Sequence, residues 1–153
     1  MNPVSDLASS VQLAGWWRRV GATLTDELIL IIPVYFVTLF GGALGGNLGA
    51  FVIGAALQGF YMVGLLSSPR GQTLGNRMAA SQVRDALTGQ SITRQQALRR
   101  WGFIAAYGAL SLGGTSMSYV TLLIGLIDVL MPLFDSRNQT LHDKIAGTIV
   151  VKV

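Results

Sequence analysis

An arginine and an aspartate stand out in the first apolar part of this 153-residue sequence. Arg19 precedes Asp26 by seven residues, and the segment 28–40 that follows holds no charge. Seven residues of helix are about two turns, or roughly 10 Å of rise along one face. A helix that carries Arg19 at a membrane surface would therefore hold Asp26 below that surface, where an ionisable group is costly unless it is paired or hydrated. Asp26 is thus a candidate functional residue.

A second carboxylate is expected at a similar depth. Asp128 stands seven residues before Asp135, which marks the polar end of the last apolar block. If the two helices are neighbours, Asp26, Asp128 and Arg19 could share one buried pocket, and Glu27 lies beside it. Because like charges raise one pKa and a guanidinium lowers it, such a cluster can hold a proton or a small cation. It can equally be a purely structural ion pair in which Arg19 neutralises Asp26.

The composition indicates an integral membrane protein and not an enzyme. Half of the residues are apolar and only 12% are charged, whereas a soluble domain carries about a quarter charged residues. There is no cysteine, and His142 is the only histidine, so no metal site can be assembled from these residue types. No serine has a histidine and an aspartate arranged around it, and no cofactor motif is present.

The basic residues predict the topology. They fall in three segments: Arg18 and Arg19; Arg70, Arg77, Arg84, Arg94, Arg99 and Arg100; and Arg137, Lys144 and Lys152. Short loops rich in Lys and Arg stay in the cytoplasm, so all three segments should be cytoplasmic. The chain must then cross the membrane an even number of times between each pair of segments. Placement of the charges at membrane ends also argues against nucleic acid as a partner.

The expected fold is an all-α membrane protein of one domain, 1–153, built as a four-helix transmembrane bundle. Its segments are an N-terminal surface segment at 1–15, spans at about 20–41, 47–66, 101–113 and 117–134, a cytoplasmic loop at 67–100 and a cytoplasmic tail at 135–153. The last two spans are short for a crossing. The alternative is one tilted span whose first half is re-entrant or interfacial.

The polar segments predict a small cytoplasmic cap. Thr73 could cap a short helix, and Thr93 with Gln96 fits a capping box at the start of a longer one. The tail at 146–153 reads as a short strand that could pair with 78–84.

Small residues in the second span predict close helix packing. Gly49, Gly54 and Gly59 each follow a small residue by four positions, a spacing that lets helices approach closely. The packing could lie within the subunit or form a homodimer face.

Several motifs together resemble those of a known family. They are Arg18-Arg19 with Asp26 in the first span, the loop motif at 71–77 with Gly71, Thr73, Gly75 and Arg77, and the tail motifs at 133–135 and 140–148 with Asp135, His142 and Asp143. In this order they resemble the RDD family of small bacterial membrane proteins, which is named for one arginine and two aspartates. The resemblance implies a multi-pass protein of the bacterial inner (plasma) membrane with both termini in the cytoplasm.

By position, the resemblance matches Arg19 to the arginine of the family name and Asp26 to the first aspartate. The second aspartate is Asp143 or Asp135, while Asp128 is a third candidate on physical grounds. The chain departs from the family at Asn76, where a lysine is usual, and at Gln82, where an arginine is usual. The charges that the family usually carries at these two positions are therefore absent from this chain.

Two functions are consistent with these features. The preferred one is an accessory or stabilising subunit of a larger membrane complex, partnered by other integral membrane subunits or by its own copies. The alternative is a cation or proton transporter, similar to the sodium/proton antiport linked to some members of the family, that uses the buried carboxylates. The central arginines could also bind anionic lipid head groups.

Overall fold

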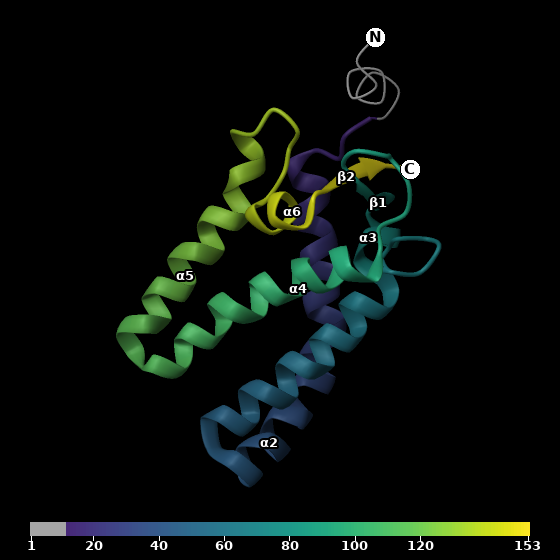
Figure 1. Cartoon of the computed structure of the whole chain (residues 1–153). Coiled ribbons are helices and arrows are strands. Elements are labelled where there is room, and N and C mark those ends of the chain that lie inside the picture. The colour runs from purple at the N-terminus through teal and green to yellow at the C-terminus, as the bar shows by residue number, and fades with distance from the viewer. Residues whose placement is uncertain (1–11) are drawn as a thin grey trace.

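The computed structural model describes residues 12–153, so the expectation for 1–11 lies outside the described residues. The elements are helices α2 (Trp16–Leu66), α3 (Leu74–Met78), α4 (Arg94–Ala109), α5 (Thr115–Leu130) and α6 (Leu141–Ala146), 3₁₀ turns η1 (Leu110–Gly113) and η2 (Met131–Leu133), and strands β1 (Ser81–Asp85) and β2 (Thr148–Lys152) (Figure 1).

Helix α2 is a hairpin of two arms. The helical conformation breaks at Gly45 and at Gly46, which has φ 59° and ψ −148°, a backbone conformation that side chains other than glycine rarely adopt. Near this tip the arms touch backbone to backbone, since a Cβ atom on Gly49 would lie 2.2 Å from the carbonyl oxygen of Gly41. The glycines therefore allow both the turn and the close contact of the arms.

Helices α4 and α5 form a second hairpin, which turns through η1 and at Gly114, with φ 91°. Its tip lies apart from the tip of the α2 hairpin (Figure 1). Trp16 joins the hairpins near the other end, where its indole Nε1 donates to the carbonyl of Val129 at 2.8 Å. Asp128 is the single buried residue of α5.

Two helices in the described part of the chain are long and apolar enough to cross a membrane: α2 and the segment Thr115–Leu133. Helix α4, with 16 residues, is shorter than a typical span. The protein is therefore mostly helical, with two candidate membrane-spanning helices and a small sheet. The four-helix transmembrane bundle stays a prediction.

A two-stranded antiparallel sheet forms the cap, with Ser81 opposite Lys152 and Asp85 opposite Thr148. This confirms the predicted pairing of tail and central loop. The sequence did not predict that Leu13 would extend the sheet through a bridge to Val151, or that Ala14, whose amide donates to the carbonyl of Val150, would be fully buried. Leu13 and Ala14, near the end of the predicted N-terminal surface segment 1–15, are therefore part of the cap.

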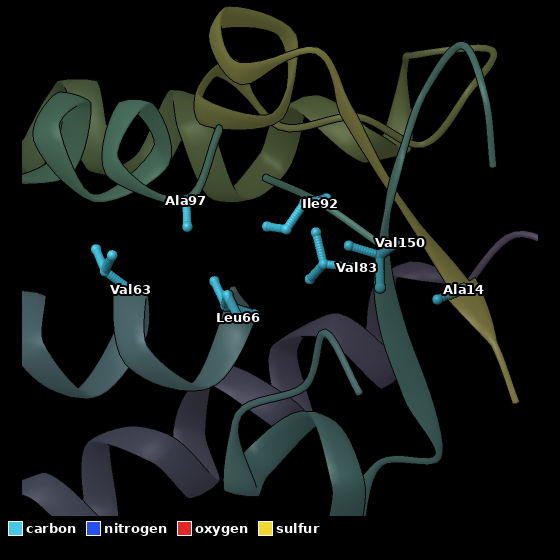
Figure 2. Close-up of a cluster of buried hydrophobic side chains, with 7 residues drawn as sticks. All are labelled: Ala14, Val63, Leu66, Val83, Ile92, Ala97 and Val150. Carbon is cyan, nitrogen blue, oxygen red and sulfur yellow. The ribbon is translucent and has the colours of Figure 1, made fainter. Parts of the chain in front are cut away.

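A hydrophobic core attaches the cap to the membrane helices (Figure 2). Its buried members come from the segment before α2, from α2, the sheet, the loop before α4 and α4 itself: Ala14, Val63, Leu66, Val83, Ile92, Ala97 and Val150. The core explains why the end of the second α2 arm, the start of α4 and the tail are held in one place.

Helix α4 begins where the capping box predicts. Thr93 Oγ1 accepts from the amide of Gln96, and the Gln96 side chain accepts from the amide of Thr93. Because the helix starts at Arg94, part of the predicted loop 67–100 is helical. Arg100 then lies on the second turn and is only 5% exposed. Arg100 is therefore covered by other parts of the chain.

Candidate functional site

Asp26 is held by three donors from two other segments. Its Oδ1 accepts from the Tyr61 hydroxyl at 2.6 Å and from the amide of Gly75 at 2.7 Å, and its Oδ2 accepts from Thr73 Oγ1 at 2.6 Å. Asp26 lies on the first arm of α2, Tyr61 on the second arm, and Thr73 and Gly75 at the start of α3. The carboxylate thus ties the α2 hairpin to the loop that follows it.

The residues of the loop motif at 71–77 allow α3 to contact Asp26. Thr73 caps α3 by accepting from the amide of Asn76. A Cβ atom on Gly75 would lie 2.0 Å from the carbonyl oxygen of Ala22, so only glycine lets α3 approach α2. Gly71 adopts φ 56° and accepts from the amide of Val83 at 3.0 Å. The glycines and the threonine therefore bring α3 against Asp26.

Arg77, the last residue of the motif, is exposed. Its side chain lies away from the contact that the rest of the motif makes.

A buried ion-pair cluster joins the tail to both hairpins. Arg19 Nη1 lies 2.6 Å from Asp143 Oδ2, and Arg100 Nη1 contacts Asp143 Oδ1. Arg100 Nη1 also donates to Thr148 Oγ1 at 2.6 Å. Asp143 is fully buried, and Arg19 is 9% exposed. One carboxylate of α6 is therefore shared by an arginine of α2 and an arginine of α4.

This finding corrects the expected pairing of Arg19 with Asp26. No ion pair joins these two side chains within 4.0 Å in the part of the chain that the structure describes. Arg19 instead bonds to Asp143, a residue of the tail motif.

The charge of Asp143 is stabilised by its neighbours. Burial alone would raise the pKa of the Asp143 carboxyl, but the charges of Arg100 and Arg19 hold that pKa well below its ordinary value of 3.8. A carboxyl with a depressed pKa in the folded state contributes stability above its unfolded pKa, and that contribution is lost as the pH falls below it.

We therefore expect an acid-dependent loss of stability that Asp143 causes. Between pH 5 and pH 3 the thermal unfolding midpoint of the wild-type protein in one detergent should fall more steeply than that of Asp143→Asn. The difference in slope between the two proteins reports Asp143 alone, because Asp85 and Asp135 are present in both. Burial raises the pKa values of Asp85 and Asp135, but hydrogen bonds outweigh it and lower both pKa values. Parallel curves for the two proteins over this range would contradict the assignment.

His142 links Asp128, the buried carboxylate of α5, to the same cluster. Asp128 accepts from the amide of His142 at 3.0 Å, and its Oδ2 lies 2.7 Å from His142 Nδ1. The other ring nitrogen, Nε2, lies 3.1 Å from Arg100 Nη2. Because a guanidinium can only donate, Nε2 is the acceptor and the proton sits on Nδ1, directed at Asp128. Asp128 thus holds α6 onto α5.

Asp135 belongs to the tail surface. It pairs with Lys144, and its Oδ2 accepts from the amides of Arg137 and Gln139 at 3.0 and 2.9 Å. These contacts shape the turn between η2 and α6.

The four residues of the predicted charge cluster line one cavity of about 310 Å³: Arg19, Asp26, Glu27 and Asp128. Asp26, Asp128 and Arg19 are each bonded to other groups. Glu27 forms no hydrogen bond or ion pair with residues 12–153, and it also borders an open groove between α2 and α4.

The three packing glycines each contact another part of the same chain. A Cβ atom on Gly49 would meet Gly41, one on Gly54 would lie 2.9 Å from Thr38, and one on Gly59 would lie 2.6 Å from the Trp101 ring. These contacts correspond to the packing within the subunit.

Sequence reasoning missed Arg100, Tyr61 and Thr148 as members of the site. The capping box places Arg100 on a helix, but its burial depends on Asp143, which lies 43 residues away. Tyr61 lies one turn before the end of α2, and only the hairpin brings its hydroxyl to Asp26. Both contacts are long-range, so residue spacing carries no signal for them.

Comparison with known proteins agrees with these motifs. Residues 13–147 match the RDD family, and the chain belongs to that family. A protein of Rickettsia prowazekii (strain Madrid E), described as uncharacterized protein RP437, is 31% identical over 83 residues, which are 54% of this chain and 38% of the relative. The chain therefore spans well under half of that relative's length. No solved structure matches the chain significantly.

Proposed function

We propose that the protein is an accessory or stabilising subunit that packs against a larger integral membrane complex. The observation that carries this proposal is that the buried carboxylates bond to other segments of the same chain. Asp26, Asp128 and Asp143 each accept hydrogen bonds that join separate segments of this chain. Groups that are committed to fixing the fold are poorly placed to exchange an ion. They make a small protein rigid, as a stabilising subunit needs to be.

The surface of α5 supports a partner. Large apolar side chains are exposed along its length, including Tyr119, Leu122, Leu123, Leu126 and Ile127. These five residues recur at spacings of three and four, so they lie on one face of α5, away from the buried Asp128. The chain itself covers little of this helix, and both lipid and a partner helix can pack there.

The cap supports an orientation in the bacterial inner membrane with all three basic segments in the cytoplasm. Leu13 from the segment before α2, strand β1 from the central loop and strand β2 from the tail meet in one sheet. Segments that meet on one side require an even number of crossings between them. A four-crossing, multi-pass topology is therefore part of the proposal.

The proposal predicts one specific neighbour on α5. A photoreactive residue at Leu122 in the native membrane should crosslink in high yield to one integral membrane protein, which mass spectrometry identifies. The matched control is the same residue at Phe60 on α2, which is also exposed and should label lipid only. Purified protein reconstituted alone in liposomes should carry no sodium or proton flux above that of empty liposomes.

Flux that is present in those liposomes and lost in Glu27→Gln would overturn the accessory role. It would favour the second candidate function, cation or proton transport. The observation behind that candidate is Glu27, an acidic side chain that lines both the cavity and the groove between α2 and α4 without a hydrogen-bond partner among the described residues. An unpaired carboxylate in a membrane segment is costly and often marks an ion pathway.

A further inference from the structure

Two buried guanidinium groups carry N–H donors that no described residue accepts. They are Nε and Nη2 of Arg19 and Nε of Arg100. The two residues are only 9% and 5% exposed, and both line the cavity of about 310 Å³. A buried donor without a partner costs about 1–3 kcal/mol, and more when the group is charged. Folded proteins therefore rarely keep such donors without a ligand or ordered water.

The arginines also carry more charge than their contacts neutralise. Arg19 and Arg100 share the single carboxylate of Asp143. The other partners of Arg100 are the hydroxyl of Thr148 and the ring Nε2 of His142, which accepts and so belongs to a neutral imidazole. Two guanidinium groups against one carboxylate leave one positive charge without a contacting anion.

The remaining acids of the cavity do not supply that anion. Asp26 accepts from three donors, and Asp128 accepts twice from His142. Glu27 lies eight residues after Arg19, about 12 Å further along α2. The cavity therefore has a positive end at the arginines, beside the cytoplasmic cap, and an acidic residue deeper along α2.

We propose that the positive end of this cavity binds a phosphate group through Arg19 and Arg100. The planar guanidinium offers several N–H donors in a geometry that matches phosphate oxygens. Apolar residues of the cavity wall, such as Leu30, Ile104 and Val129, suit the carbon portion of a phosphate ester. A lipid phosphodiester and free phosphate offer the same chemistry to the arginines. This site does not depend on the accessory role.

The test compares two probes and two matched variants. Delipidated protein in detergent is titrated with phosphatidylglycerol and with inorganic phosphate by calorimetry, and diacylglycerol serves as the phosphate-free lipid control. Arg19→Lys keeps a positive charge that can pair with Asp143 but loses the planar fork. Arg77→Lys makes the same change at an exposed arginine. Wild type and Arg77→Lys should bind one of the probes, and Arg19→Lys should bind it at least about tenfold more weakly.

The two probes distinguish the sources of phosphate. Binding of phosphatidylglycerol without binding of phosphate assigns the cavity to a lipid, and binding of phosphate assigns it to a soluble anion. Native mass spectrometry of the wild-type protein needs no variant and should show one retained anionic lipid in the first case. If wild type binds neither probe and retains no lipid, the cavity holds water only and the proposal is wrong. The proposal is also wrong if a folded Arg19→Lys binds a probe as tightly as wild type, because the probe then binds without the Arg19 guanidinium.

Discussion

Asp143→Asn is expected to lower the free energy of unfolding by about 3–5 kcal/mol, the usual cost of breaking a buried ion pair by removing one partner. The substitution keeps the size of the side chain but removes the charge that neutralises Arg19 and Arg100. It also replaces an oxygen acceptor with an amide donor that faces guanidinium donors. Denaturant titration in a fixed detergent, monitored by circular dichroism, measures the loss.

Lys144→Gln is the matched control on the same helix. It breaks the ion pair between Lys144 and Asp135. The Lys144 side chain is 41% exposed, and a solvent-exposed ion pair contributes about 0–1 kcal/mol to the free energy of unfolding. Equal losses for the two variants would mean that the buried cluster contributes no more than a surface pair.

The second large effect is expected from Gly75→Ala, which should cost about 3 kcal/mol or more. The added methyl would lie 2.0 Å from the carbonyl oxygen of Ala22 and 2.7 Å from Asp26 Cγ. The first neighbour is backbone of α2, which cannot rotate away, so α3 must move and Asp26 must lose its bond to the Gly75 amide. Overpacking of this kind usually costs about 1–3 kcal/mol and sometimes more. The thermal unfolding midpoint measures it.

Gly102→Ala in α4 provides the comparison. A Cβ atom there meets nothing within 4 Å, and alanine is favoured over glycine in a helix interior by about 0.5–1 kcal/mol. This variant should be as stable as wild type or slightly more stable. A Gly75→Ala protein that behaves in the same way would refute the close approach of α3 to α2.

The local features of this fold could be predicted from the sequence because their signals are local. Thr73 and Thr93 have the residue type and spacing of helix caps, and the β-branched tail at 148–151 reads as a strand. The structure confirms each of them. The RDD family was also identified from short motifs that lie in the correct order along the chain.

Partner choice within the site could not be predicted because it depends on tertiary packing. Arg19 and Asp26 are seven residues apart on one helix, and this spacing favoured the prediction that they pair. That spacing takes no account of the tail, which folds back and brings Asp143 to Arg19 across 124 residues of sequence. Asp26 is then free to accept from Tyr61 and Thr73. Two acceptable partners for one arginine differ in burial and not in residue type, so the sequence alone leaves the choice open.

The pairing of Arg19 with Asp143 is tested most directly by a double-mutant cycle on the free energy of unfolding. The cycle of Arg19→Gln with Asp143→Asn should give a coupling energy of about 1–3 kcal/mol, because the two side chains are in direct contact. The cycle of Arg19→Gln with Asp26→Asn should be additive within about 0.5 kcal/mol. Additivity in the first cycle, or stronger coupling in the second, would contradict the pairing of Arg19 on α2 with Asp143 of the tail.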